Sequence, residues 1–331
     1  MEGAADTFLS IRNCLYEASF NLRKFQTNSE ELNKRLDDEL GREKCTEPVR
    51  RAQEDDTTYA SFELTEMTGP KNTENSRVLG VGWDLVKDEL LLTLRLEEES
   101  EVRLTKRQIA RTIAGIYDPM GLLSPVVLPL KVFLKELHTS GLNWDNELTA
   151  DQQKKWSALR QLTVEMVPIA VPRCYFDEQT AGTQRMKVSL HGFGDASKAG
   201  YAAAVYITIE GTNTAASLVA SKTRVAPIKT QTIPRLELMA ALLTARLVVR
   251  VKLALSSVYE IASCFCWTDS MVVFHWITRE EKEFQQFVEN RTSEIRRLTP
   301  APCWSYCPGQ ENPADIPTRG VSGSDLKGLT K

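Results

Sequence analysis

The sequence lacks any long hydrophobic run. No apolar stretch approaches the roughly 20 residues that a membrane-spanning helix needs. The first residues, MEGAADTFLSIRNC, also lack the basic region and the apolar core of a secretory signal peptide. These absences exclude a membrane partner and predict an intracellular protein, cytoplasmic or nuclear.

A disulfide framework and a strongly basic composition are absent as well. The seven cysteines are odd in number and follow no disulfide spacing, which is typical of a reducing compartment. The formal net charge of −3 excludes a wholly basic nucleic-acid surface but leaves room for a local basic groove. With 331 residues, 42% hydrophobic and 26% charged, the chain has the composition of a globular protein of two or three domains.

The N-terminal part shows helical patterns and one hairpin. Residues 5–40 carry apolar side chains at helical spacing, and residues 41–76 are polar and interrupted, as in a loop or linker with SFELTEM as its one plausible strand. Two β-rich runs, RVLGVGWDL and ELLLTLRL, then flank the turn VKD and predict a hairpin. Asp84 and Asp88 of this hairpin are better explained by the turn than by paired catalytic acids.

Three helices are expected after the hairpin. The first has Thr105 as its N-cap and ends at Asp118, because the residue before a proline is pushed out of the α region. The second is entered after Pro125 and ends near Gly141, and the third starts at Thr149. No chemical motif accompanies them.

A different order of elements follows a polar break at residues 179–184, where we expect a domain boundary. The expected strands are KVSLHGFGD, YAAAVYITIE, ASLVASKTRV, ASCFCWTD and CWSYCPG. A long helix begins near Pro234, where a first-turn proline is tolerated, and separates the third strand from the fourth. Two shorter helices separate the fourth strand from the fifth. The order predicts an α/β domain.

Four acids lie at the ends of these elements. Asp195 ends the first strand, Asp269 ends the fourth, and Asp315 follows the fifth in NPADIPTRG. Glu237 lies in the first turns of the long helix among apolar neighbours, where an uncompensated carboxylate costs free energy. Each acid alone also fits a turn, a cap or a helix N-terminal charge. Four converging carboxylates require cations, and Mg²⁺ prefers such oxygen ligands.

The segments that carry these acids resemble a known family. HGFGDASKAGYAAAVY, SKTRVAPIKTQTIPRLELMAA, WTDSMVVFHWI and GQENPADIPTRG resemble the ribonuclease H domain of Pao/BEL-type retrotransposon polyproteins. Upstream, FNLRKFQTNS, RVLGVGWDL and LTKRQIARTIAGIYDPMGLLSPV resemble the segments that follow a reverse-transcriptase active site. The region from about 78 to 240 resembles the family often called Pao retrotransposon peptidase. The resemblance covers nearly the whole chain apart from residues 41–76.

The resemblance implies a division of the chain. Residues 1–76 would be a truncated palm remnant and loop, and residues 77–180 a primer-grip-like hairpin with thumb or connection helices. Residues 185–321 would form a ribonuclease H-like domain, a mixed five-stranded sheet with flanking helices, and residues 322–331 a tail. The implied partners are an RNA–DNA hybrid and other parts of a retroelement polyprotein.

The resemblance also implies that Asp195, Glu237, Asp269 and Asp315 are the ribonuclease H carboxylates. Two Mg²⁺ ions, with Mn²⁺ as a substitute, would clamp the scissile phosphate of the hybrid, one activating the attacking water and the other stabilising the leaving 3′ oxygen. Asp195 would bridge both ions. Glu237 and Asp269 would hold one ion, and Asp315 would hold the other.

Nucleic-acid contacts are expected around the same motifs. Ser270 follows Asp269 as in the family's T-D-S and is expected to contact the nucleic-acid backbone. The 2′-OH groups would distinguish the RNA strand from DNA. Basic residues near the motifs are candidates for phosphate contacts, although solvated surface charge explains each equally well. They are Lys198, Lys222, Arg224, Lys229 and Arg235.

Three family features are missing. The polymerase motif Y-x-D-D is absent, so we expect the chain to begin just after it and its first part not to polymerise. No DSG or DTG occurs, which argues against an aspartic peptidase. No histidine stands shortly before Asp315, and His275 falls in a predicted helix instead, so turnover is expected to be slow.

Other interpretations stay open. A decayed or co-opted fragment that binds nucleic acid or protein without catalysis is the alternative to an active nuclease, and a Pao-type peptidase ranks last. Four cysteines have CxC and CxxxC spacing and could bind zinc, although strand cysteines are usually small buried apolar residues: Cys264, Cys266, Cys303 and Cys307. Trp267, Phe274 and Trp276 could stack on bases, but core packing is favoured.

Overall fold

The computed structural model divides the chain into two compact units, Met1–Leu91 and Leu92–Lys331. It describes residues 2–17, 27, 29, 31–35, 38, 76–78, 81–92, 103–165, 169–176, 185–211, 216–279 and 284–319. The predicted linker up to residue 75, the break at 179–184 and the tail at 322–331 lie outside these residues. The predicted domain boundaries therefore stay predictions.

The first unit contains a helix and a small antiparallel sheet. Helix α1 (Glu2–Glu17) packs Ala5 and Phe8 against Leu32. Strands β2 (Val81–Asp84) and β3 (Glu89–Leu92) form the expected hairpin. The predicted strand RVLGVGWDL is wrong as a single element, because β1 (Ser76–Val78) pairs antiparallel with β2.

The hairpin turn uses both acids that the sequence placed there. Asp84 Oδ1 accepts hydrogen bonds from the backbone N–H groups of Val86 and Lys87 at 2.9 and 3.0 Å. Asp88 adopts a positive φ of 54° and accepts a hydrogen bond from Trp83 Nε1 at 2.9 Å. The structure thus gives Asp84 and Asp88 the turn role that was favoured over paired catalytic acids.

Three helices open the described part of the second unit: α3 (Lys106–Ala114), α4 (Ser124–Thr139) and α5 (Ala150–Glu165). The N-cap at Thr105 is confirmed, with a reciprocal capping box to Gln108. Helix α3 ends at Ala114, earlier than the predicted Asp118, because Gly115 already serves as its C-cap. The short strand β4 (Ile169–Pro172) was not predicted.

An apolar cluster holds these helices together. Phe133 and Trp156 stack with ring centroids 5.9 Å apart, and the side chains around them come from all three helices and from Leu148. The cluster consists of Ile109, Ile113, Leu130, Phe133, Leu137, Leu148 and Trp156. Among the described helices, none is both long and apolar enough to cross a membrane.

The predicted mixed five-stranded sheet is confirmed. Its strands are β5 (Lys187–Ala196), β6 (Gly200–Ile209), β7 (Ser217–Val225), β8 (Glu260–Thr268) and β9 (Trp304–Tyr306). The order across the sheet is β7-β6-β5-β8-β9. The β7–β6 and β6–β5 pairs are antiparallel, whereas the β5–β8 and β8–β9 pairs are parallel. The ends of β5 and β8 therefore lie side by side.

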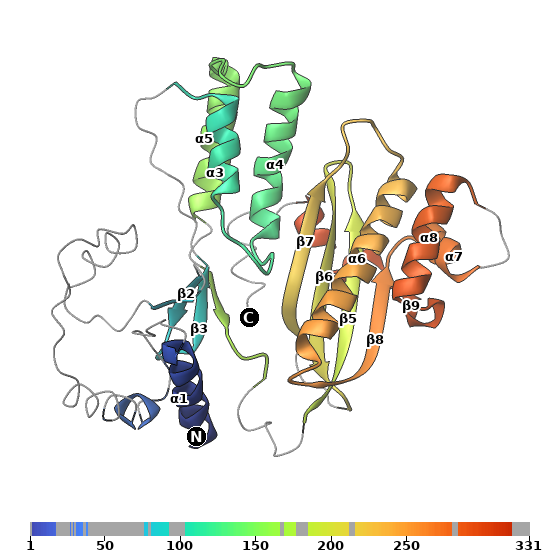
Figure 1. Cartoon of the computed structure of the whole chain (residues 1–331). Coiled ribbons are helices and arrows are strands. Elements are labelled where there is room, and N and C mark those ends of the chain that lie inside the picture. Colours follow the sequence, from blue (N-terminus) through green and yellow to red (C-terminus); the bar gives the residue numbers. More distant parts are fainter. Residues whose placement is uncertain are drawn as a thin grey trace. The chain divides into compact units, whose positions relative to one another are not determined.

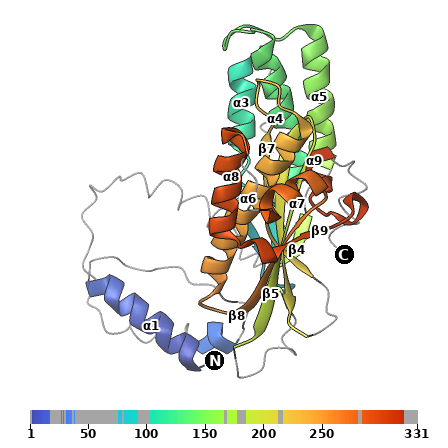
Figure 2. The ribbon, with the colours of Figure 1, turned by 90° about the vertical axis from the view of Figure 1, so that its right-hand side faces the viewer.

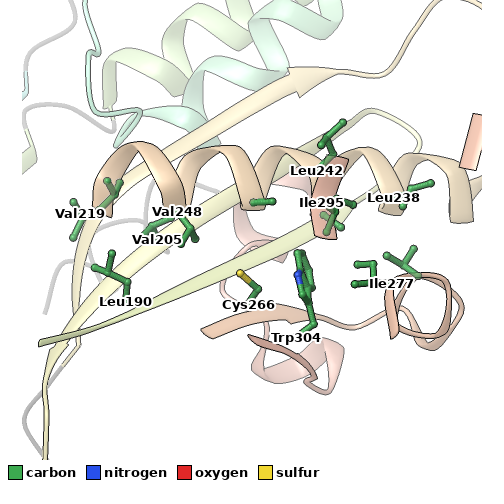
Figure 3. Close-up of a cluster of buried hydrophobic side chains, with 14 of the residues drawn as sticks. Leu190, Val205, Val219, Leu238, Leu242, Val248, Cys266, Ile277, Ile295 and Trp304 are labelled. Atoms are coloured by element: carbon green, nitrogen blue, oxygen red, sulfur yellow. The ribbon is translucent and has the colours of Figure 1, made fainter. Parts of the chain in front are cut away.

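Helix α6 (Ile233–Leu255) covers one face of this sheet, and α8 (Gln286–Leu298) packs beside it (Figures 1 and 2). Apolar side chains from the sheet and the helices fill the space between them, including Leu190, Val205, Leu238 and Trp304 (Figure 3). Burial of this cluster is the main favourable contribution to the fold, at about 25 cal/mol per Å² of apolar surface.

Glycine lets α6 approach the central strand closely. A Cβ atom added at Gly194 would lie 2.5 Å from Thr244 Oγ1 and 3.2 Å from the Ala240 carbonyl oxygen. One added at Gly192 would lie 2.4 Å from Val248. The two glycines of HGFGD therefore fix how close α6, and with it Glu237, lies to the end of β5.

Four short elements lie around the described part of the sheet: α7 (Met271–Thr278) follows β8, one 3₁₀ turn (Ala301–Cys303) precedes β9, another (Gly309–Glu311) follows it, and α9 (Asp315–Arg319) comes after that turn. Helix α4 contacts both α9 and β7. The turn before α4 is joined to β7 by a hydrogen bond from Ser221 N to Met120 O of 2.8 Å. The helical segment and the sheet therefore pack directly on each other within this unit.

Candidate active site

The structure brings the four predicted acids to one end of the sheet. Asp195 lies at the end of β5, and Asp269 directly follows the neighbouring strand β8. Glu237 lies in the second turn of α6, and Asp315 is the first residue of α9. The negative charges of Asp269 and Asp315 each raise the pKa of Asp195, and the charge of Asp195 raises the pKa of Glu237. The four carboxylates thus lie within electrostatic range of one another.

Asp195 is the most enclosed of the acids, with 6% of its surface exposed. Burial raises its pKa to about 6, and the neighbouring carboxylates contribute in the same direction. The hydroxyl of Thr318 on α9 donates a hydrogen bond to Asp195 Oδ2, which opposes the rise. A buried carboxyl with a pKa near neutrality is a candidate for chemistry.

Glu237 is held by the residue after Asp269. Ser270 Oγ donates a 2.5 Å hydrogen bond to Glu237 Oε2 and accepts the Val273 N–H at 3.3 Å as the N-cap of α7. Burial raises the pKa of Glu237, and this hydrogen bond lowers it. The Ser270 side chain is buried and engaged within the protein. Its expected contact with nucleic acid stays a prediction.

Asp269 carries a buried oxygen with no partner. Its Oδ1 has no hydrogen-bond partner in the described part of the chain. Burial raises the pKa of Asp269, and the charge of Glu237 raises it further. The loop after β9 passes close by, since a Cβ atom added at Gly309 would lie 3.2 Å from Asp269 Oδ2. An unpartnered buried carboxylate oxygen is costly unless a cation or a donor reaches it.

Residues around Asp315 support the site from the C-terminal side. Arg319 Nε pairs with Asp315 Oδ1 at 2.6 Å, one helical turn away. Ser197 Oγ donates to the Thr318 carbonyl oxygen at 2.9 Å and ties α9 to the turn after β5. Asn312 Nδ2 donates to the Gly194 carbonyl oxygen at 3.0 Å, and its Oδ1 accepts the Ala314 N–H.

Sequence reasoning missed Thr318 and Asn312. Both side chains are buried, and both hydrogen-bond to β5 immediately beside the predicted acids. The available signal was their position, because NPADIPTRG carries both of them together with Asp315. Polar residues packed so close to one acid are candidates for positioning it.

The donor set fits a hard divalent cation, although the side chains are not arranged around one. Across the described ranges, no three His, Cys, Asp or Glu side chains are placed to hold a metal ion as they stand. One oxygen each of Asp195, Glu237 and Asp315 is engaged by a neighbouring hydroxyl or guanidinium group. The donors are nevertheless all oxygen, mutually repelling and partly buried, and Asp269 Oδ1 is free, which suits Mg²⁺.

The structure gives little support to zinc binding by the cysteines or to base stacking by the aromatic residues. The same absence of a metal-holding group within the described residues extends to Cys264, Cys266, Cys303 and Cys307. Phe274 and Trp276 pack against the main apolar cluster, as expected of core residues. Trp267 stacks on Phe193 with ring centroids 6.0 Å apart.

The predicted basic residues lie on several different elements of the domain. Lys198 is exposed in the turn between β5 and β6, directly after Asp195 and its neighbours, and Lys229 is exposed before α6. Arg235 lies two residues before Glu237, with its guanidinium carbon 4.7 Å from the centroid of the Phe287 ring. Lys222 and Arg224 are exposed on the edge strand β7. Their contacts with phosphate stay predictions.

Parts of this chain are similar to known proteins. Residues 105–270 match the family model described as Pao retrotransposon-like RNaseH-like domain. No curated protein matches the chain.

Several solved ribonuclease H structures are similar in fold. The N-terminal RNase H domain of a Mycobacterium tuberculosis protein, fused to maltose-binding protein, is 13% identical and covers 44% of this chain and 96% of its own, with a TM-score of 0.29. RNase H1 from the archaeon Halobacterium salinarum is 13% identical, and the match covers 39% of this chain and 90% of that protein's chain, with a TM-score of 0.28. LC11-RNase H1 in complex with an RNA/DNA hybrid is 13% identical and covers 42% and 99%, with a TM-score of 0.30.

These TM-scores are low, so the fold assignment rests on the strand order and on the family match. The matched segment runs from the N-cap of α3 to the N-cap of α7 and contains Asp195, Glu237 and Asp269. It spans half of the 331-residue chain. The chain therefore belongs to the Pao retrotransposon-like RNaseH-like domain family.

Proposed function

We propose that the chain is a Mg²⁺-dependent ribonuclease that cleaves the RNA strand of RNA–DNA hybrids endonucleolytically. Its acids would be Asp195, Glu237, Asp269 and Asp315. The observation that carries the proposal is the unpartnered, buried Asp269 Oδ1, which lies among carboxylates whose charges raise the pKa of Asp195, Glu237 and Asp269. A site of this kind is costly for the apo protein and becomes favourable when a cation binds, which is the expected pattern of a metal-dependent hydrolase.

The four acids would have different roles in binding a metal ion. Asp195 is central, because the charges of Asp269 and Asp315 raise its pKa and its own charge raises the pKa of Glu237. A divalent cation bound by these acids, Mg²⁺ or Mn²⁺ in its place, supplies Lewis-acid stabilisation of the charge that develops on the phosphate oxygens. The four carboxylates supply negative oxygen ligands, and Asp195 is buried while the other three are partly buried.

Neighbouring side chains orient the acids. Thr318 donates a hydrogen bond to Asp195 Oδ2, and Ser270 donates one to Glu237 Oε2. Each bond fixes the direction of the other oxygen of that carboxylate. Arg319 compensates the charge of Asp315 in the apo protein. No histidine stands near Asp315 in the sequence, so proton transfer to the leaving oxygen falls to solvent or to a carboxyl group, and turnover is expected to be slow.

The decisive experiment measures cleavage of an end-labelled RNA–DNA hybrid by the full chain in the presence of Mg²⁺. Asp269→Asn keeps the shape of the side chain and removes its charge, and it should lower the cleavage rate by at least 100-fold. Asp145→Asn is the matched control, because Asp145 is an exposed acid paired with Arg107 on the helical segment. If the wild-type protein and Asp269→Asn are equally inert, the nuclease proposal is wrong.

One observation favours the alternative of a non-catalytic fragment. The 2.6 Å ion pair between Arg319 and Asp315 neutralises the fourth acid, as in a site that no longer holds metal. Such a protein would bind the hybrid equally well with Mg²⁺ and with EDTA and would leave it intact. Fluorescence anisotropy of a labelled hybrid, measured in both buffers beside the cleavage assay, separates the two functions. Binding to other parts of a retroelement polyprotein belongs to this same alternative.

A further inference from the structure

A cavity of about 540 Å³ lies away from the four acids, between the Asp118–Gly121 turn, the edge strand β7 and the C-terminal half of α6. The turn is fixed on β7, because Ser221 donates hydrogen bonds to the carbonyl oxygens of Met120 and Gly121. Gly121 has a φ of +74°, and a Cβ atom there would overlap the Ser221 carbonyl oxygen. The wall of the cavity is therefore built by a contact that only glycine permits.

The cavity carries excess positive charge. Lys131 of α4, Lys222 of β7 and Arg250 of α6 line it, and within the described residues the side chains of these three make no hydrogen bond and no ion pair. Burial lowers the pKa of Lys131, and the charge of Lys222 contributes in the same direction. Repelling cations that converge on one space are stabilised by a bound anion.

Among the described residues of the lining, the one acid is already engaged. Asp118 accepts hydrogen bonds from the backbone N–H groups of Leu122 and Leu123, at 2.9 and 2.8 Å, and so orders the entry to α4. Its charge offsets one of the three cations, which leaves two positive charges unmatched. A phosphomonoester carries about −1.5 to −2 charges at pH 7 and matches this excess, whereas a single carboxylate would leave part of it uncompensated.

The remaining walls suit an organic body attached to the anion. Apolar residues line the cavity together with Tyr175; they include Ile116, Val127, Leu247 and Val251. Its volume falls within the range of about 300–1,000 Å³ that is typical of small-molecule sites, far more than inorganic phosphate needs. Ser124 and Thr223 add hydroxyl groups that can pair with polar edges of a ligand.

We propose that this cavity binds the terminal phosphate and the adjoining nucleoside of a nucleotide, at a site separate from the nuclease acids. The nucleotide can be free in solution, or it can be the 5′-phosphorylated end of a nucleic-acid strand. The chemistry is the same in both cases, with Lys131, Lys222 and Arg250 around the phosphate and the apolar walls around the nucleoside.

The test measures binding of adenosine 5′-monophosphate to the full chain by isothermal titration calorimetry, in EDTA so that no divalent metal contributes. We expect saturable binding at one site, with inorganic phosphate and adenosine each at least tenfold weaker. Lys222→Gln and Arg250→Gln should each weaken binding about tenfold, or about 1.4 kcal/mol. Lys252→Gln is the matched control, because Lys252 is an exposed cation on the same helix that does not line the cavity.

A second pair of variants tests the space rather than the charge. Ala254→Phe fills the cavity from α6 and should abolish binding, whereas Leu253→Phe, at an exposed position outside the lining, should not. A single-stranded oligonucleotide with a 5′-phosphate, compared with the same strand with a 5′-hydroxyl, distinguishes the two sources. Tighter binding of the phosphorylated strand than of the mononucleotide assigns the site to strand ends, and the reverse assigns it to free nucleotide.

Three results would overturn the proposal. The first is absence of saturable binding of both the mononucleotide and the phosphorylated strand. The second is equal affinity for inorganic phosphate and for the mononucleotide, which would remove the organic part of the ligand. The third is an equal loss of affinity in Lys252→Gln and Lys222→Gln, which would show general charge attraction. None of these outcomes depends on nuclease activity.

Discussion

The Ser270 hydroxyl donates a 2.5 Å hydrogen bond to Glu237 Oε2 and so joins the start of α7 to the second turn of α6. Ser270 Oγ also accepts a hydrogen bond from the Val273 N–H and so caps α7. One side chain therefore sets both the beginning of α7 and the direction of a candidate metal ligand. Removing the Ser270 hydroxyl should therefore lower both the stability of the protein and its cleavage rate, and the two effects can be measured separately.

Ser270→Ala should destabilise the protein by about 1 kcal/mol, because the cap of α7 is lost. It should also lower hybrid cleavage by tenfold or more, because a hydrogen bond to a charged group contributes about 1.5–3 kcal/mol. Urea denaturation and the cleavage assay measure the two effects. Ser270→Thr keeps the hydroxyl and should retain most of both, and an inactive but stable Ser270→Thr would contradict the positioning role.

The raised pKa of Asp195 predicts how the stability of the metal-free protein depends on pH. The folded carboxyl keeps its proton up to about pH 6, whereas the unfolded chain releases it near pH 4. Between these values the folded state binds more protons, so the free energy of unfolding should fall as pH rises and level off above the window. Asp195 alone should account for up to about 3 kcal/mol.

This fall can be measured by urea denaturation in EDTA between pH 4 and pH 7. Asp195→Asn should make the pH dependence shallower and should raise the stability at pH 7, because the repelling charge is gone. Asp145→Asn is a useful control, since Arg107 lowers the pKa of Asp145 and its removal should leave the fall in place. A wild-type stability that rises through this window would contradict the prediction.

Gly194→Ala should disturb the packing of α6 on the sheet. The new Cβ would lie 2.5 Å from Thr244 Oγ1 and 3.2 Å from the Ala240 backbone, so the helix or the strand must shift. Overpacking of this kind costs about 1–3 kcal/mol of folding free energy. Gly115→Ala is the matched control, because its nearest contacts would be ordinary ones at 3.5 Å, and its urea midpoint should stay close to that of the wild type.

Local sequence patterns predicted the sheet because each of its strands carries its own signal. β5 and β6 are apolar runs of strand length separated by small residues, and α6 follows a proline in its first turn. Asp195 and Asp269 were placed at strand ends by the same local patterns. The parallel pairing of β5 with β8 then brings the two acids together, which the resemblance to ribonuclease H implied.

Contacts between distant segments could not be read in this way. Ser270 meets Glu237 across 33 residues, and Thr318 meets Asp195 across 123, and no short-range pattern specifies either pair. The division of RVLGVGWDL into β1 and β2 was also missed, because a continuous β-rich run does not show where the chain reverses. Tertiary pairing decided these features, and propensity did not.

Thr318 provides the most direct test of support for the site from α9. Its hydroxyl is buried, donates to Asp195 Oδ2 and lies 2.9 Å from the Asp315 carbonyl oxygen, so it connects two of the four acids. Thr318→Val keeps the shape and removes the hydroxyl. We expect kcat for hybrid cleavage to fall by tenfold or more with little change in KM, because Asp195 loses its orientation while the substrate surface is unchanged.

Thr318→Ser restores the hydroxyl without the methyl group and separates positioning from packing. If the hydroxyl positions Asp195, Thr318→Ser should recover most of the kcat that Thr318→Val loses, even though the missing methyl group leaves a small cavity. If Thr318 only fills space, Thr318→Val should be the more active of the two variants. Thermal denaturation of both proteins shows whether a loss of activity reflects unfolding, because a positioning role predicts folded Thr318→Val protein at the assay temperature.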